Sequence, residues 1–315
     1  MPVGTLIGIG AGLASALLFY SAAGGSPLLS TILLLLTPLP TLLAGLGWGW
    51  LAAATGGVAG ALAVLVFAES NSFAIGFVLA LGVPAAGIAY AAYLSRAVPD
   101  APDQREWYPA GRLLAAMSLY AGALPLLIPA LTGGSYEELR VPAAEFSRRL
   151  SQRAPELGLR PLSEEQAAGL AQAFVASLPA VLAAYWLAVF SLNTYLAGRI
   201  ARASGRLARD WPDLSALALP AGFTLLIVPA LAATWMGGSL AILGTGFTGA
   251  LLFAHLISGL ALMHYIARHW APWLLWFVYG GLILLGPYTA LAITLAGLLD
   301  PLLKVRQRFH PQSPS

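Results

Sequence analysis

Two histidines carry the most recognisable chemistry in this sequence. His255 lies inside the apolar run from Ser239 to Ile266, and His264 lies near the end of that run. An imidazole can bind a metal ion or move a proton, and an ionisable residue within a membrane span is a functional candidate by default. No second histidine or acidic residue lies on the helical face of His255 at metal-ligand spacing. The sequence therefore predicts no metal site and no cofactor.

The two histidines have different expected roles. His255 is a candidate ligand-binding residue, although a neutral histidine that hydrogen-bonds to a neighbouring helix is the commoner case. His264 is followed by Arg268 one helical turn later. We predict that His264 is a structural residue, paired with Arg268 at the membrane interface.

A second polar group lies between two apolar runs, from Glu69 to Ser72. Such a group is either a solvated turn, which is the simpler interpretation, or the polar mouth of a ligand pocket. On the second interpretation Glu69 and Asn71 join His255 as candidate ligand-binding residues. A polar-lined cavity that opens to the outside is then expected near them.

Signals for enzyme catalysis are weak. The chain has no cysteine, which excludes disulfides, thiolate metal sites and cysteine nucleophiles. No expected span carries Asp or Glu away from its ends, whereas proton-driven carriers and intramembrane hydrolases use buried carboxylates, metal clusters or an activated serine. We expect no catalytic residue, and the sequence favours a protein that is not an enzyme.

The run Gly244 to Gly249 matches the pattern of a dinucleotide-binding loop. That motif works only at a strand-to-helix turn of a soluble parallel sheet, and this copy lies inside an apolar span. We predict a closely packed or locally unwound helix there instead.

Composition sets the class of elements that must position these residues. Hydrophobic residues make up 59% and charged residues 9% of the chain, with a mean hydropathy of +0.79, against about 25% charged residues in a soluble domain. The net charge of +3 comes mostly from arginines in loops, so we expect a lipid bilayer as partner and no nucleic acid. The first residues lack the positive region of a cleavable signal, so they are predicted to form a retained span.

The fold class predicted is an all-α, polytopic helical membrane bundle that forms a single domain over 1–315. A span needs about 17 to 25 apolar residues. Eight long transmembrane helices are expected, at approximately Val3–Ser21, Leu28–Leu46, Trp50–Ala68, Phe73–Leu94, Leu113–Leu131, Ala167–Leu192, Leu214–Met236 and Ser239–Ile266.

A ninth apolar segment, Ala271 to Leu299, is too long for one straight crossing. As a single helix it would measure about 44 Å, against a hydrocarbon core of about 30 Å. It contains the turn signal Gly286-Pro287. It is therefore either a broken segment that crosses once or, as we favour, a short helical hairpin that returns Arg306 to its starting side. We predict that Asp300 and Arg306 are structural residues, with Asp300 pairing with Arg306 or a nearby arginine to fix this hairpin.

Two further features concern helix packing. Pro38 and Pro40 remove two hydrogen bonds from the second span, which predicts a structural break whose freed carbonyls need partners. Gly8 and Gly12 give the first span a small-residue face. That face either docks a protein partner subunit or packs against the similar face of the third span, which is the simpler case.

Arginines predict the orientation in the membrane. A cluster follows the sixth span with few acids nearby, at Arg199, Arg202, Arg206 and Arg209. Positive residues beside spans are retained on the cytoplasmic side, so 195–213 is expected inside. Alternation then places 96–112 and both termini inside, with a short cytoplasmic tail at 304–315, and the connector 132–166 outside. In that connector we predict a short amphipathic helix on the membrane surface, carrying Phe146 and Leu150.

Short motifs at both ends of the chain resemble a known family. They are Pro38-Leu39-Pro40, Gly45-Leu46-Gly47-Trp48-Gly49, Gly259-Leu260, His264, Gly297-Leu298-Leu299-Asp300 and Arg306. In these residues the chain resembles the YybS-like family of bacterial inner-membrane proteins, whose function is unknown. The resemblance implies a location in the bacterial inner (plasma) membrane.

The YybS-like family is distantly similar to the substrate-binding subunits of energy-coupling-factor vitamin transporters. That similarity implies a helical bundle that captures a small molecule near its outer face and docks to partner subunits. This chain is longer, so no substrate-binding residue is carried over. Two functions remain open: a small-molecule binding or transport subunit, and a non-transporting membrane scaffold or regulatory protein that acts through protein partners.

Overall fold

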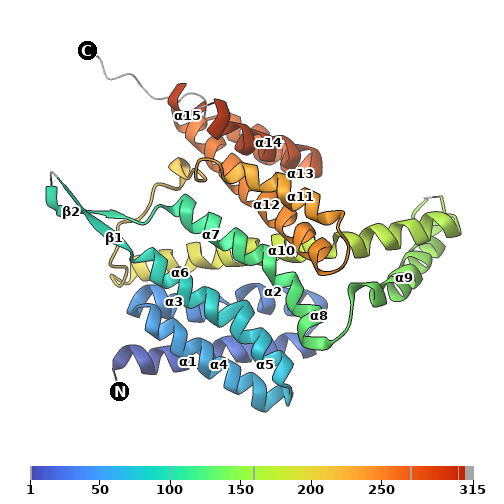
Figure 1. The fold of residues 1–315 in the computed structure, drawn as a ribbon, viewed down its shortest axis with the longest axis horizontal. Coiled ribbons are helices and arrows are strands. Elements are labelled where there is room, and N and C mark those ends of the chain that lie inside the picture. Colours follow the sequence, from blue (N-terminus) through green and yellow to red (C-terminus); the bar gives the residue numbers. More distant parts are fainter. Residues whose placement is uncertain (1, 100, 159, 270–271, 304, 309–315) are drawn as a thin grey trace.

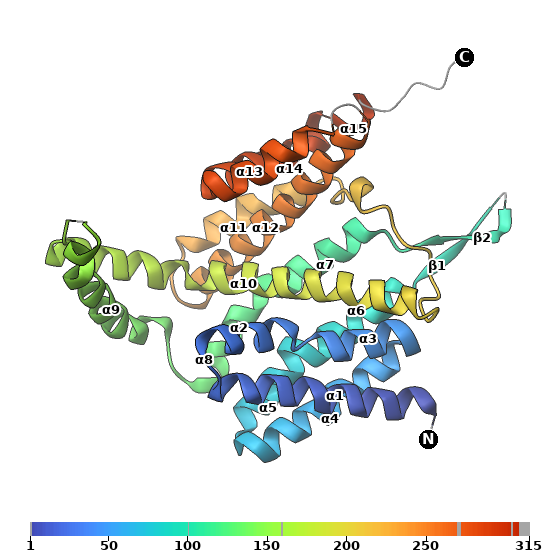
Figure 2. The same ribbon diagram turned by 180° about the vertical axis from the view of Figure 1, so that it is seen from behind.

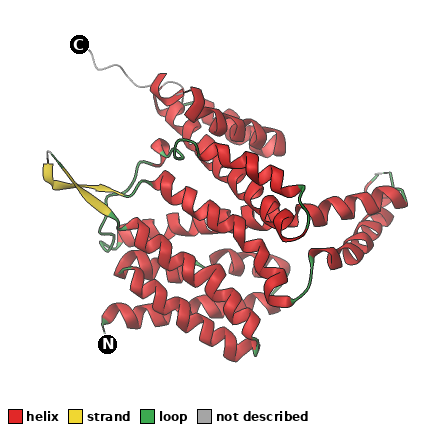
Figure 3. Cartoon of the chain, viewed as in Figure 1, coloured by secondary structure: helices red, strands yellow, loops and turns green. Residues whose placement is uncertain are grey.

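The fold is almost entirely helical, as the sequence predicts, with one small β-hairpin (Figure 3). The computed structural model describes residues 2–99, 101–158, 160–269, 272–303 and 305–308. The helices of the N-terminal part are α1 (Val3–Ser21), α2 (Pro27–Leu36), α3 (Leu39–Trp48), α4 (Trp50–Ala68), α5 (Asn71–Phe77), α6 (Val83–Ala92), α7 (Ala110–Ala123) and α8 (Leu127–Thr132). Those that follow are α9 (Arg140–Arg153), α10 (Glu164–Ala203), α11 (Ile227–Thr234), α12 (Gly238–His269), α13 (Leu274–Leu284), α14 (Pro287–Leu303) and α15 (Val305–Arg308).

Seven helical segments in the described part of the chain are long and apolar enough to cross a bilayer. They are Val3–Gly24, Pro27–Trp48, Trp50–Ala68, Asn71–Ala92, Ala110–Thr132, Glu164–Ala203 and Gly238–Arg268. Six of them coincide with a predicted span to within a few residues, and Glu164–Ala203 continues past the predicted end at Leu192. A run of about 20 apolar residues satisfies its own backbone only as a helix in lipid. The chain is thus an integral, multi-pass membrane protein.

The prediction of one long helix over Leu214–Met236 is wrong. Only Phe223–Thr234 forms a short apolar helix, and residues 217–221 are extended or turned backbone. Pro220 lacks the N–H that a helix needs, and Gly222 adopts a left-handed conformation with φ of 79°. An apolar composition alone therefore did not make this stretch a regular span.

The C-terminal segment forms the helical hairpin rather than a single crossing. Helices α13 and α14 pack against each other, and the turn between them contains Gly286 at φ 46° with Pro287 beginning α14. The helix α14 also packs along α12, where Gly259 and Gly297 allow close backbone contact. Apart from α15, the predicted tail 304–315 lies outside the described residues.

The bundle has two distinct ends, which lie left and right in Figure 1. The N-terminal end of α1, the β-hairpin and α15 lie at one end, and α9 projects at the other; Figure 2 shows the same arrangement from behind. The β-hairpin pairs β1 (Ser95–Val98) with β2 (Ala101–Trp107) in antiparallel fashion. The predicted all-α fold class did not include this hairpin. Arg96 Nη2 and Glu106 Oε2 form an exposed ion pair across the two strands, 2.7 Å apart.

The helix α10 organises the bundle, since it packs against α3, α7, α9 and α12. It begins with a capping box: the Gln166 backbone N–H donates to Ser163 Oγ, and the Ser163 N–H donates to Gln166 Oε1. Forty residues of helix measure about 60 Å, twice a hydrocarbon core of about 30 Å. The N-terminal part of α10, beside α9, extends beyond the rest of the bundle (Figure 1).

The helix α9 packs on this extension of α10. Ser147 and Ser151 are buried in the seam, while the predicted apolar pair Phe146 and Leu150 is exposed. The amphipathic helix of the connector therefore exists, but a helix–helix contact holds it in place.

Small residues bring the first and third spans together. An added Cβ on Gly12 would lie 2.0 Å from the Gly56 carbonyl oxygen, and one on Gly8 would lie 2.3 Å from the Ala52 carbonyl oxygen. The two small-residue faces pack against each other inside the protein, so they are not free to dock a partner subunit.

The glycine run of α12 is packed and helical throughout. Gly244 lies against α11, Gly246 against the Gly122 carbonyl of α7, and Gly249 against Ala180 of α10. Glycine at these positions lets three neighbouring helices approach one backbone. The local unwinding that was the other expectation does not occur.

Candidate functional site

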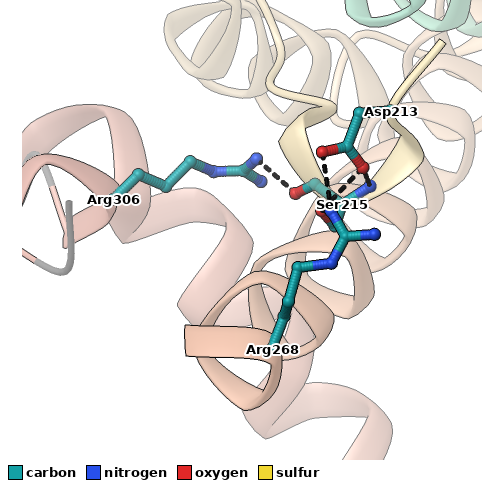
Figure 4. A network of polar contacts seen from close by, with 4 residues as sticks. All are labelled: Asp213, Ser215, Arg268 and Arg306. Carbon is teal, nitrogen blue, oxygen red and sulfur yellow. Dashed lines mark hydrogen bonds and ion pairs between the residues drawn. The ribbon is translucent and has the colours of Figure 1, made fainter. Parts of the chain in front are cut away.

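Arg306 is the centre of a polar network at the end of the bundle that carries the β-hairpin (Figure 4). Its Nε donates to Asp300 Oδ2 at 2.7 Å, Nη1 donates to the Ser215 carbonyl at 2.8 Å, and Nη2 donates to the Leu217 carbonyl at 2.7 Å. The side chains of Arg306 and Asp300 are only 15% and 6% exposed. The ion pair expected from sequence is present, and its structural role stays a prediction.

The irregular backbone beside Arg306 explains why a buried arginine is useful there. Residues 217–221 form no helix, so neighbouring carbonyls lack intrahelical donors. A guanidinium offers five N–H groups and can satisfy several carbonyls at once. Arg306 therefore ties the C-terminal hairpin to a stretch that cannot satisfy its own hydrogen bonds.

Asp213 extends the network towards α12. Arg268 Nη1 donates to Asp213 Oδ2 at 3.0 Å, and the backbone N–H and the hydroxyl of Ser215 donate to Asp213 Oδ1 at 3.0 and 2.7 Å (Figure 4). Chiefly the Ser215 hydroxyl, together with Arg268, holds the pKa of Asp213 below its usual value. The two arginines therefore bind the same short segment, since Arg306 donates to the Ser215 carbonyl and Arg268 to the Asp213 carboxylate.

A partly enclosed cavity of about 850 Å³ lies beside this network. Its walls come from α7, the C-terminal halves of α10 and α12, and the segment 207–217. Most lining side chains are apolar, among them Leu113, Met117 and Ile257. The polar or charged lining residues are Ser191, Thr194, Tyr195, Arg209, Trp211, Asp213, Ser215, His264 and Arg268. A volume of 300–1,000 Å³ with a few polar groups is typical of small-molecule sites.

Two hydroxyl groups of this cavity have no partner among the described residues. Ser191 Oγ and Thr194 Oγ1 are both shielded from solvent and make no hydrogen bond. They lie three residues apart on α10 and therefore on one helical face. An unsatisfied buried hydroxyl is unfavourable, and each can rotate about χ1 towards a bound acceptor or donor.

Arg209 also lines the cavity and is partly committed to structure. Its Nη1 donates to the Ala92 carbonyl at 3.1 Å, and its Nη2 donates to the Tyr108 carbonyl at 3.3 Å. These bonds join the ends of α6 and β2 to the segment after α10. The remaining N–H groups of Arg209 and those of Arg268 give the cavity a positive rim.

The three candidate ligand-binding residues do not meet. Glu69 and Asn71 are exposed at the turn between α4 and α5, and His255 is fully buried within α12. None of the three lines the cavity. His255 Nδ1 donates to the Leu251 carbonyl at 2.7 Å, and Nε2 bonds the Thr224 hydroxyl at 2.9 Å. This is the interhelical hydrogen bonding that was the commoner expectation for a histidine within a span.

His264 and Arg268 take other partners than each other. His264 Nε2 lies 2.7 Å from the Tyr279 hydroxyl of α13, whereas Arg268 pairs with Asp213. The i, i+4 spacing places both residues on one face of α12. Their hydrogen-bond partners, the Tyr279 hydroxyl and the Asp213 carboxylate, lie on other elements. His264 thereby contributes to the C-terminal hairpin and to the cavity wall.

The break at Pro38 and Pro40 has a partner that sequence reasoning missed. The helix is interrupted between α2 and α3, and the Leu35 carbonyl accepts from Asn193 Nδ2 at 2.7 Å. The fully buried Asn193 also donates to the Val189 carbonyl. An amide within an apolar helix was visible in the sequence, as were the hydroxyls of Ser191 and Thr194, but nothing local showed which carbonyl or cavity they face.

No group of three or more potential metal ligands lies together in the part of the chain that the structure describes. Comparisons of the chain with protein-family models, curated proteins and solved structures give no match. The arrangement of its own residues is therefore the basis for any functional conclusion.

Proposed function

We propose that this membrane protein binds a small molecule in the cavity between α7, α10, α12 and the segment 207–217. The observation that carries the proposal is the pair of unpartnered, buried hydroxyls of Ser191 and Thr194 in the wall of a cavity of about 850 Å³. Native structures leave few buried polar groups without a hydrogen bond, and a ligand is one way to satisfy them.

The lining points to an amphiphilic ligand. Leu113, Met117 and Ile257 present hydrocarbon to an apolar body, and Arg209 and Arg268 offer N–H donors at the rim. A carboxylate or another acceptor-rich group matches these donors. The ligand class is thus a small molecule with an apolar body and an acidic or acceptor-rich group.

Charge supports an orientation in which the cavity lies at the cytoplasmic end. The sequence segments 95–112, 199–215 and 268–306 carry ten Lys or Arg and six acidic residues, whereas 69–72 and 132–166 carry five Arg and seven Glu. The positive-inside rule then places the first set, and both termini, in the cytoplasm. The resemblance to YybS-like proteins supports the bacterial inner membrane as the location. In this orientation the cavity differs from the outer-face site that the transporter resemblance implies.

The test is mass spectrometry of small molecules carried by gently purified protein. We expect the wild type to retain a molecule that Ser191→Ala/Thr194→Val loses, because the second protein keeps the cavity shape and lacks both hydroxyls. Glu69→Gln/Asn71→Ala is the matched control and should keep the molecule, since neither residue lines the cavity. An identical set of molecules on the wild type and on Ser191→Ala/Thr194→Val argues against the site.

A second candidate, the scaffold or regulatory protein, is favoured by one specific observation. Phe146 and Leu150 are exposed on α9, which packs on the part of α10 that extends beyond the bundle. Apolar residues exposed away from the spans are typical of protein-binding surfaces. Crosslinking in membranes tests it: a reproducible partner that Phe146→Ser/Leu150→Ser abolishes supports this function, and none recovered from wild type counts against it.

A further inference from the structure

Three arginines at and just after the C-terminal end of α10 lie against aromatic rings. The guanidinium carbon of Arg206 lies 5.3 Å from the ring centre of Trp48, that of Arg202 lies 6.0 Å from the ring centre of Trp211, and that of Arg199 lies 5.9 Å from the ring centre of Tyr195. These residues come from three parts of the chain: the end of α3, the end of α10 and the segment that follows it. Tertiary packing therefore assembles this surface, which we call the arginine–aromatic patch.

The arginines of the patch have no acidic partner in the described residues. All three side chains are exposed, and the ion pairs that the structure shows involve Arg96, Arg140, Arg149, Arg268 and Arg306 instead. The fourth arginine of the cluster, Arg209, lies over Trp107, but it donates to two backbone carbonyls and lines the cavity, so it is not part of the patch. The patch thus keeps three uncompensated positive charges facing outward.

The place of the patch matches the height of lipid headgroups. Along α10 the side chains of Val181, Tyr185, Leu192 and Tyr195 are exposed and follow one face at helical spacing, which is the stripe expected to face lipid. Arg199 and Arg202 continue directly from the end of this stripe. Tryptophan and tyrosine are enriched at the membrane–water interface, and arginine is enriched beside the cytoplasmic ends of spans.

The chemistry of the patch fits a phosphate group. Arg199 Nη1 donates to the Tyr195 hydroxyl at 3.3 Å. The other N–H groups of a guanidinium that lies over a ring point outward in its plane, and they match phosphate oxygens in a bidentate geometry. Contact with the rings restricts the arginines before a ligand arrives, which lowers the ordering cost of binding. Clusters of arginine beside the cytoplasmic end of a span are typical of sites for anionic lipid headgroups.

We propose that the arginine–aromatic patch of Arg199, Arg202 and Arg206 binds the headgroup of an anionic phospholipid. None of these three arginines lines the cavity, although two of the rings beneath them, Tyr195 and Trp211, are shared with its wall. Substitution of the arginines therefore tests the patch without changing the cavity lining. It commits to lipid rather than to free phosphate, since the patch ends a stripe of exposed apolar residues.

The chain supplies a matched control at its other end. Arg148, Arg149 and Arg153 of α9 are also exposed, but Arg149 lies 3.8 Å from Glu145, and none of the three stacks on an aromatic ring in the described structure. R148Q/R149Q/R153Q therefore removes the same charge as R199Q/R202Q/R206Q without touching the patch.

The experiment adds phosphatidylglycerol or phosphatidylcholine to delipidated full-length protein in neutral detergent, and reads bound lipid by native mass spectrometry and the thermal midpoint. We expect phosphatidylglycerol to bind and to raise the midpoint of the wild type and of R148Q/R149Q/R153Q. R199Q/R202Q/R206Q should bind it about tenfold or more weakly. The proposal would be overturned if phosphatidylcholine bound and raised the midpoint as much as phosphatidylglycerol does. It would also be overturned if both triple variants lost the same binding, or if orthophosphate raised the midpoint as much as phosphatidylglycerol.

A second triple variant keeps the test decisive if the glutamine protein does not fold. R199K/R202K/R206K retains the charge and removes the planar guanidinium groups. We expect a weaker preference for phosphatidylglycerol over phosphatidylcholine. An unchanged preference would contradict recognition by guanidinium groups held on rings.

Discussion

The N-terminal and C-terminal regions of this protein both pack helices closely through glycines, but they differ in their polar contacts. The helices α1 and α4 meet through glycine faces, and an added Cβ on Gly12 would lie 2.0 Å from a facing carbonyl. The helices α12 and α14 also meet through glycines, and an added Cβ on Gly297 would lie 2.1 Å from the His255 carbonyl. Among the residues that the structure describes, only the C-terminal region adds a largely buried ion pair, between Arg306 and Asp300.

The difference follows from how far the backbone of each region satisfies its own hydrogen bonds. The helices α1 and α4 satisfy most of their backbone internally, and they meet through close van der Waals packing. The C-terminal hairpin lies beside the irregular stretch 217–221, whose neighbouring carbonyls need outside donors. The polar network therefore lies beside the stretch that does not form a regular helix.

The largest expected effect comes from breaking the buried ion pair in the C-terminal region. Arg306→Leu leaves Asp300 buried without its partner, and losing one member of a buried pair costs about 3–5 kcal/mol. Asp300→Asn should lose less, because a neutral amide is tolerated there more easily. For both variants, the free energy of unfolding is measured in detergent and the protein level is measured in the membrane.

The exposed pair on the β-hairpin is the control for this prediction. Arg96 and Glu106 are also 2.7 Å apart, but their side chains are 78% and 53% exposed, so Arg96→Leu should cause no measurable loss. If Asp300→Asn and Arg306→Leu both leave stability and membrane level unchanged, the structural role of the pair is refuted.

The next effect tests the glycine seam of the N-terminal region. Gly12→Ala introduces a Cβ into the backbone of α4, and overpacking of this kind costs about 1–3 kcal/mol. Gly10→Ala on the same helix meets no atom within 4 Å, so it should be neutral or slightly stabilising. Unfolding midpoints of the two proteins are compared, and equal values would remove the contrast.

A smaller effect is expected at Asn193 of α10, whose side chain bonds a carbonyl of the N-terminal region. Asn193→Leu removes the donor to the Leu35 carbonyl beside the proline break, at a cost of about 1 kcal/mol. Ser191→Ala, two residues away, has no described hydrogen bond to lose and serves as control. Greater destabilisation by Ser191→Ala than by Asn193→Leu would contradict this assignment.

The smallest effect is a pH dependence from the edge of the polar network. The pKa of Asp213 is lowered in the folded protein, so its contribution to stability is present above the unfolded pKa of about 3.9 and is lost as pH falls towards the folded pKa. The thermal midpoint is followed from neutral pH into this acid range. Asp213→Asn should show a shallower decline there, and an identical decline would show that Asp213 contributes nothing.

Local pattern predicted the helices and failed at one segment for a physical reason. Leu214–Met236 has the hydropathy of a span, but hydropathy reports composition and not whether each N–H finds a carbonyl. Pro220 and Gly222 were visible breakers, and the presence of prolines in helices such as α10 made them weak evidence. Whether a proline bends or ends a helix depends on the partners that surround it.

The candidate site was predictable in part. The pairing of Asp300 with Arg306 followed from short sequence spacing and charge. The cavity could not be found in this way, because Ser191, Ile257 and Arg209 meet only through the packing of α10, α12 and the segment after α10. Glu69 and Asn71 were predicted as candidate ligand-binding residues because they are isolated polar residues between apolar runs, but they lie at an exposed turn.

The sequence by itself determined that this chain is an all-helical, multi-pass membrane protein, because lipid leaves an apolar chain few ways to satisfy its backbone. It also determined where glycine permits close contact and where charge gathers. Only the tertiary structure decided which carbonyls Arg306 and Asn193 satisfy, which rings the arginines of α10 meet, and where a cavity remains. Those outcomes depend on contacts between residues far apart in the chain, and no local period encodes them.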